Sequence, residues 1–228
     1  MIPNLGVKSL IPSSVIVVDG DDTKKLLDKT DDNESASNPK TKTTIGIGNL
    51  LTVGNLIASG LKRSENSDVL YVRKEGKRMM DVLDNMTTSK PIQFQGCPGI
   101  GKSTALFAYL NLPEVADKGY LWIHFEWDDC SIIHRKASGD IISTGVHDIH
   151  YAYLKELVRS VSDIEFIVLD GVANDGLHSN LFATAGKRND VKVVSCTSRG
   201  AKSFRTELAA KMGWPKKVTV DSWTFEEY

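Results

Sequence analysis

The chain has 228 residues, 41% of them apolar and 25% charged, and its formal net charge at pH 7 is −1. This composition is typical of a globular protein, and a net charge so close to zero excludes electrostatic attraction of the whole chain to nucleic acid or to an anionic membrane. A local basic patch could still contact nucleic acid. No apolar run approaches the roughly 18 to 20 residues that a transmembrane helix needs.

Cysteine usage and the N-terminus both favour an intracellular protein. Cys97, Cys130 and Cys196 form neither a C-x-x-C pair nor a zinc spacing, which favours free thiols in a reducing compartment. The first stretch, "MIPNLGVKSLIPSSVIVVDG", has no basic region followed by an unbroken apolar core. We therefore expect no standard secretory signal.

Residues 1–68 differ in composition from the rest of the chain. Residues 19–44 are rich in Asp, Lys, Ser, Thr and Asn, and such a segment cannot bury enough apolar surface to offset the entropy cost of ordering it. Residues 45–61 are apolar but interrupted by glycines, which indicates a weak helix or a docking segment. We therefore expect a flexible arm over residues 1–68 and a packed domain over residues 69–228.

Helices and strands are expected to alternate through the packed domain. Helical spacing of apolar residues predicts helices over residues 71–86, 101–112, 148–160 and 201–213. Short β-rich or continuous apolar runs predict strands over residues 91–96, 119–127, 164–171, 191–200 and 216–223. This alternation is typical of a doubly wound α/β domain with a mostly parallel sheet.

The stretch "GCPGIGKST" satisfies the P-loop pattern G-x-x-x-x-G-K-[ST], and it lies between a predicted strand and a predicted helix, as the pattern requires. Glycines let the loop wrap so that backbone N–H groups converge on an anion, and the following helix adds its positive N-terminal end. Lys102 would bind the β- and γ-phosphates of a nucleotide. The residues expected to form the nucleotide-binding loop are Gly96, Cys97, Pro98, Gly99, Ile100, Gly101, Lys102, Ser103 and Thr104.

A Mg²⁺ site is expected from Ser103 together with Asp170. Asp170 follows four apolar residues in "FIVLD", the pattern of a buried strand that ends in a Walker B carboxylate. The Ser103 hydroxyl would bind Mg²⁺ and the Asp170 carboxylate would hold it through water. The five histidines show no metal spacing.

The residues that would drive hydrolysis are less clearly marked. Many hydrolytic P-loop ATPases have a glutamate directly after the Walker B aspartate, whereas this chain has Gly171. Glu126, at the end of another predicted strand, and Asp175 are the alternative carboxylates that could polarise the attacking water. In "CTSR", at the end of the strand over residues 191–200, Thr197, Ser198 or Arg199 could sense the γ-phosphate, and Arg199 could stabilise charge in the transition state.

Four segments, in this order, resemble Crinkler-type proteins, which are effector-like proteins of oomycetes and some fungi, and the related retrotransposon-hot-spot proteins of trypanosomes. They are "LYVRK" at residues 70–74, the P-loop, "IVLDG", and "VTVDSWTFEEY" at residues 218–228. In the last of these, residues 223–227 match the family's W-[ST]-x-x-E segment. The resemblance covers about residues 70–228.

The resemblance implies an ATPase of the additional-strand class, related to STAND and AAA-like NTPases, and an effector that in many members is secreted and acts in a host nucleus. The chain departs from the family at both ends. Its first 68 residues do not look like a ubiquitin-like header, and it stops where the family continues into helical lid elements. We therefore expect a P-loop domain that is truncated at its C-terminal end or minimal, in which oligomer-dependent hydrolysis and nuclease activity are in doubt.

Three functions remain open from the sequence. The first is an ATP-binding, Mg²⁺-dependent NTPase that acts as a switch with slow hydrolysis. The second is a small-molecule or nucleotide kinase, although "HSNLFATAGKRND" is a poor arginine-rich lid. The third is a non-catalytic nucleotide-binding module that recruits a protein partner or self-associates. The absence of an N-K-x-D base-reading motif favours ATP over GTP.

Overall fold

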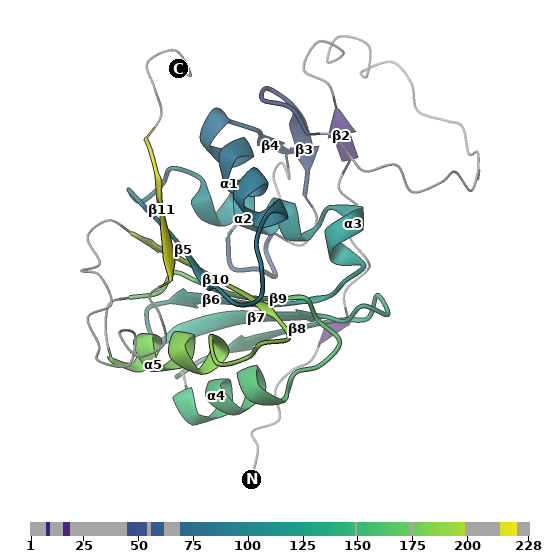
Figure 1. Cartoon of the computed structure of the whole chain (residues 1–228). Helices are drawn as coiled ribbons and strands as arrows, with labels where there is room; N and C mark the ends of the chain where they lie inside the picture. The colour runs from purple at the N-terminus through teal and green to yellow at the C-terminus, as the bar shows by residue number, and fades with distance from the viewer. Residues whose placement is uncertain are drawn as a thin grey trace.

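The computed structural model describes residues 8–9, 16–18, 45–53, 56–61, 69–148, 150–173, 176–198 and 215–222. These residues form two sheets and five helices (Figure 1). The strands of the large sheet are β1 (Lys8–Ser9), β5 (Ile92–Gly96), β6 (Tyr120–Glu126), β7 (Asp129–Arg135), β8 (Ile141–Val146), β9 (Phe166–Asp170), β10 (Lys192–Ser198) and β11 (Lys216–Val220). The small sheet comprises β2 (Ile16–Val18), β3 (Leu50–Thr52) and β4 (Val69–Tyr71). The helices are α1 (Lys74–Asp84), α2 (Lys102–Leu110), α3 (Pro113–Ala116), α4 (Tyr151–Ser160) and α5 (Gly176–Ala185).

The large sheet is mixed but mostly parallel, in the order β1-β8-β7-β6-β9-β10-β5-β11. The strands β6, β9, β10, β5 and β11 all run parallel to their neighbours in that set, whereas β7, β8 and β1 extend the sheet with antiparallel pairings. The described residues therefore confirm an α/β domain with a mostly parallel sheet. β10 lies between β5 and β9, so the strand before the glycine-rich loop and the strand that ends in Asp170 are not adjacent.

Helices cover both faces of the large sheet. In Figure 1, α1, α2 and α3 lie on one face and α4 and α5 on the other. Side chains alternate between the faces along each strand, so Trp122 and Val168 pack toward α2, whereas Ile123 and Leu169 pack toward α4 and α5. All five residues of β9 are buried, which explains why its sequence is a continuous apolar run that ends in one carboxylate.

The hairpin of β7 and β8 is the main element that the sequence analysis did not predict. Its turn contains Gly139, which has a φ of 96°, and buried residues such as Cys130 and Ile141 face the core from its two strands. The hairpin widens the sheet beyond β6, because β7 pairs antiparallel with β6 from Tyr120↔Arg135 to Glu126↔Asp129. Helix α5 was also not predicted.

The helix predicted over residues 71–86 is shorter at both ends. Tyr71 belongs to β4, and Arg73 has extended backbone angles at the N-cap of α1. Because β4 pairs with β3, residues 69–71 satisfy their backbone groups in a sheet rather than in the helix. The helix predicted over residues 201–213 lies outside the described residues. None of the helices in the described part of the chain has the length and apolarity needed to cross a membrane.

Part of the expected N-terminal arm packs into the core. Ile45, Leu51, Val53 and Leu56 are at most 7% exposed and belong to the same apolar cluster as α1 and α2. The indole of Trp122 on β6 donates a hydrogen bond to the Ser59 carbonyl at 3.0 Å. A domain boundary at residue 69 therefore excludes residues between 45 and 61 that pack against the core of the domain.

Candidate functional site

The glycine-rich loop joins β5 to the N-terminus of α2, as its pattern predicts. Gly99 and Gly101 have φ values of 76° and 81°, the left-handed region that residues with a Cβ rarely adopt. Gly101 is the N-cap of α2, so the chain turns sharply into the helix and Lys102 is its first residue. Helix α2 is nine residues long, and its N-terminal N–H groups and dipole face the loop.

The Lys102 side chain is folded into this loop. Its Nζ donates hydrogen bonds to the carbonyl oxygens of Cys97 at 2.8 Å and Gly96 at 3.1 Å. Burial lowers the pKa of Lys102, and the nearby Asp170 charge opposes that shift. The ammonium group is thus bound by backbone carbonyls rather than hydrated by water. A phosphate that entered the loop would compete with those carbonyls for the hydrogen bonds of Lys102.

Ser103 and Asp170 lie together although 67 positions separate them in the chain. The Ser103 hydroxyl donates to Asp170 Oδ1 at 2.7 Å. Asp170 is fully buried at the end of β9, and its other carboxylate oxygen, Oδ2, lies 2.6 Å from His124 Nδ1. Both oxygens of this carboxylate are therefore held, one from α2 and one from β6.

Cys196 on β10 faces the same site. Its thiol is buried, and burial together with the Asp170 charge raises its pKa well above the ordinary value. Cys196 is therefore an uncharged thiol beside the carboxylate. The sequence analysis considered Cys196 only as a free thiol, because its spacing to the other cysteines matches no metal or redox motif.

The position after Asp170 has no room for a side chain. Gly171 has a φ of 73°, and a Cβ built on it would lie 2.4 Å from the Phe125 carbonyl oxygen. A glutamate directly after the aspartate is therefore incompatible with this backbone.

Three residues predicted to assist hydrolysis have different outcomes. Glu126 ends β6 and is half-buried, but the β6 residue that hydrogen-bonds Asp170 is His124, two positions earlier. The catalytic role of Glu126 therefore stays a prediction. Arg199 and Asp175 lie outside the described residues.

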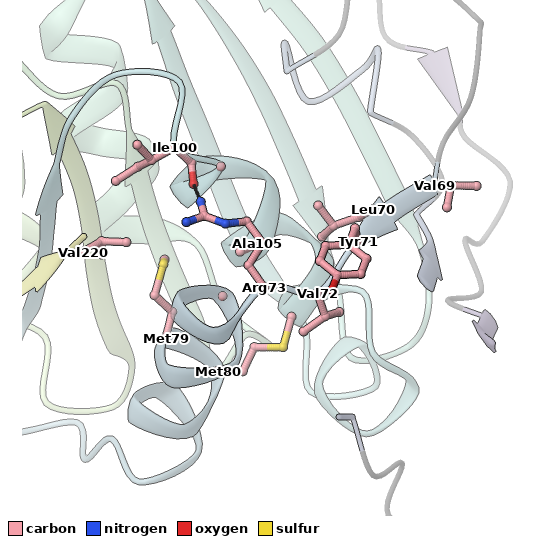
Figure 2. Close-up of a pocket in the computed structure, with 12 residues that line it drawn as sticks. Val69, Leu70, Tyr71, Val72, Arg73, Met79, Met80, Ile100, Ala105 and Val220 are labelled. Carbon is pink, nitrogen blue, oxygen red and sulfur yellow. Dashed lines mark hydrogen bonds between the residues drawn. The ribbon is translucent and has the colours of Figure 1, made fainter. Parts of the chain in front are cut away.

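An apolar pocket of about 140 Å³ opens beside the end of the loop, between β4, the start of α1 and the start of α2 (Figure 2). Its apolar lining includes Leu70, Val72, Met79, Ile100, Ala105 and Val220. The Arg73 guanidinium crosses this pocket and donates a hydrogen bond to the Ile100 carbonyl at 2.8 Å, which ties the loop to the N-cap of α1.

The residues present fit a magnesium ion that is shared with phosphates. Among the described residues no group of three or more His, Cys, Asp or Glu side chains could hold a metal ion. Mg²⁺ in phosphate sites commonly takes only one or two protein oxygens and completes its shell with water and phosphate oxygens. The Ser103 hydroxyl and the Asp170 carboxylate are hard oxygen donors of that kind, 2.7 Å apart.

The three cysteines should react at very different rates in the folded protein. Cys97 lies half-buried in the loop, whereas Cys130 and Cys196 are buried, and burial raises the pKa of Cys130 to about 12. Because the thiolate is the nucleophile, we expect a bulky maleimide to modify Cys97 first. Peptide mass spectrometry over a time course checks this, with urea-unfolded protein, in which all three react, as the control. Equal rates for Cys97 and Cys196 in the folded protein would contradict the burial described above.

No family model matches the chain, and no curated protein matches it. Among solved structures, that of C. elegans PCH-2 aligns with 77% of this chain at 12% sequence identity and a TM-score of 0.34. The aligned part spans 49% of the PCH-2 chain, about half of its length. This similarity is too low to assign an activity.

Proposed function

We propose that the chain is an ATP-binding, Mg²⁺-dependent P-loop NTPase module that acts as a nucleotide switch with slow hydrolysis. The observation that carries the proposal is the hydrogen bond of 2.7 Å between Ser103, at the start of the helix after the glycine-rich loop, and Asp170, at the end of a buried strand. These two oxygens meet where the γ-phosphate end of a nucleotide bound by the loop would lie.

Each polar group of the site has a role in binding a triphosphate. The loop N–H groups and the N-terminus of α2 bind phosphate oxygens, and Lys102 exchanges its two loop carbonyls for phosphate oxygens. Ser103 and Asp170 hold the Mg²⁺ ion, which when bound neutralises phosphate charge. Thr104, which follows Ser103 in α2, would bind phosphate together with the loop.

The apolar pocket beside Gly101 supports the placement of the base. It lies between β4, the start of α1 and the start of α2, and Asp170 is not one of its lining residues, so we place the base of a nucleotide that occupies the loop there. Its aliphatic and methionine side chains suit the flat faces of a purine. The missing N-K-x-D motif favours adenine over guanine.

The strand order and Gly171 together support a slow hydrolase over a kinase. β10 between β5 and β9 is the arrangement of additional-strand ATPases, whereas small-molecule kinases usually have the two strands adjacent. No glutamate can follow Asp170 on this backbone, so an attacking water lacks its usual base. Glu126 and Arg199 are the candidates for completing the site. Because Gly171 leaves no usual base for hydrolysis, it also favours the alternative of a module that binds nucleotide without hydrolysing it.

Kinship with Crinkler-type effectors is part of the proposal. Of the two segments specific to that resemblance, residues 70–74 form the end of β4 and the start of α1, where Arg73 contacts the loop, and residues 223–227 lie outside the described residues. An effector role, secretion followed by action in a host nucleus, and a protein partner or self-association all rest on this resemblance.

Replacement of Lys102 by alanine tests the binding site. We expect the variant to bind a fluorescent ATP analogue about 10- to 100-fold more weakly, because charge-assisted hydrogen bonds to the phosphates are lost. Lys187→Ala removes the same charge from the exposed turn after α5 and should bind like the wild type. Phosphate release by the wild type should run well below about 1 s⁻¹. Equal affinity of the wild type and Lys102→Ala would refute the proposed site.

A further inference from the structure

We propose that His124 is the residue that positions Asp170 for Mg²⁺, a role that rests on the proposed nucleotide site. His124 lies on β6, and the parallel register of β6 and β9 places it level with Asp170. Its Nδ1 lies 2.6 Å from Asp170 Oδ2. No metal spacing in the sequence points to this histidine, because its partner is 46 positions away on the neighbouring strand.

The direction of this hydrogen bond follows from the chemistry of the partners. Asp170 has to be ionised to help hold a cation, and an ionised carboxylate only accepts hydrogen bonds. The proton in the contact is then on His124 Nδ1. Ser103 donates to Oδ1 and His124 to Oδ2, so two donors from different elements fix the plane of the carboxylate.

The imidazole ring is itself held in place on both sides. It stacks parallel to the indole of Trp122, with ring centroids 6.4 Å apart and planes 10° apart. A Cβ on Gly60 would lie 2.6 Å from His124 Cδ2, so the backbone at Gly60 packs closely against the edge of the imidazole ring. Hydrogen-bond partners that orient metal-binding side chains act in this way, and their loss commonly weakens metal binding about 10- to 100-fold.

Three substitutions separate positioning from packing. His124→Ala removes the donor and the ring. His124→Asn keeps an amide that can donate from the place of Nδ1, because both side chains branch at Cγ. His124→Gln carries its amide one methylene further, near the place of Nε2, and so retains polarity and bulk without the donor in position.

The experiment measures Mn²⁺ binding by electron paramagnetic resonance on the full chain with a saturating non-hydrolysable ATP analogue, and separately measures affinity for that analogue in EDTA. We expect His124→Ala and His124→Gln to weaken Mn²⁺ binding about 10- to 100-fold and His124→Asn to bind within about threefold of the wild type. Affinity in EDTA should be the same for all four proteins, because the interactions of His124 that the structure shows are with Asp170 and Trp122 and not with the phosphate-binding loop.

Two results overturn the inference, and they differ from failure of the proposed function. Unchanged Mn²⁺ affinity in His124→Ala, or equal losses in His124→Asn and His124→Gln, would remove the positioning role and leave the nucleotide site standing. A wild type that binds no analogue would remove both. Circular dichroism establishes folding, and if His124→Ala does not fold, the ratio between His124→Asn and His124→Gln decides the question.

Discussion

Replacing Gly171 by glutamate is expected to destabilise the fold by more than about 3 kcal/mol rather than to supply a base for hydrolysis. A side chain at this φ of 73° carries backbone strain, and its Cβ would lie 2.4 Å from the Phe125 carbonyl oxygen, a backbone atom that cannot move without disturbing β6. The measurement is urea unfolding followed by circular dichroism, with Gly171→Ala beside Gly171→Glu to show that the first side-chain carbon is responsible.

Alanine substitutions at two other glycines distinguish the cost of backbone strain at positive φ from the cost of a steric clash of the added Cβ. Gly139 has a φ of 96° with nothing within 4 Å of an added Cβ, so Gly139→Ala should cost only about 1 to 2 kcal/mol. Gly145 has open space and no positive φ, so Gly145→Ala should be neutral or slightly stabilising. A Gly171→Glu protein as stable as the wild type, with faster phosphate release, would contradict both the backbone geometry and the explanation of slow turnover.

Leu51→Ala is expected to lower the free energy of unfolding by about 2 to 5 kcal/mol, because it deletes a fully buried side chain from the core that α1 and α2 share. The prediction bears on the function because the segment that follows, around residues 59 and 60, contacts Trp122 and His124 beside the site. Urea unfolding of the full chain is again the measurement.

Ile57→Ala is the matched control from the same segment. Ile57 is 49% exposed, so its truncation should cost less than about 1 kcal/mol. If residues 1–68 were a flexible arm throughout, Leu51→Ala and Ile57→Ala would have equally small effects. That result would contradict the packing of Ile45, Leu51, Val53 and Leu56 into the core.

The elements nearest the loop could be predicted from sequence because local chemistry determines them. The glycines, Lys102 and the continuous apolar run before Asp170 each follow from what one turn or one buried strand requires. The contact between Ser103 and Asp170 was predicted from the P-loop pattern as a whole, in which a buried strand that ends in aspartate follows the glycine-rich loop in the sequence.

The contacts of His124 and Arg73 could not be predicted in the same way. Each depends on the register between segments far apart in the chain, His124↔Asp170 in one case and the approach of α1 to the loop in the other. Strand alternation puts His124 on the same face as Trp122, but it does not say which residue of β9 lies opposite. Residues 45–61 could be interpreted from sequence only as a weak helix or a docking segment for a related reason, since the four buried apolar side chains Ile45, Leu51, Val53 and Leu56 carry no periodic signal.

Thermal unfolding of the wild type with and without Mg²⁺ and ATP tests the central claim most directly. A ligand present at 100 times its dissociation constant stabilises the folded state by about 2.7 kcal/mol. For a chain of this size we expect the midpoint to rise by about 5 to 10 °C, less with GTP, and by about half that rise or less in Lys102→Ala, which binds ATP more weakly. A wild-type midpoint that stays unchanged with either nucleotide at millimolar concentration would contradict the assignment of this loop as a nucleotide site.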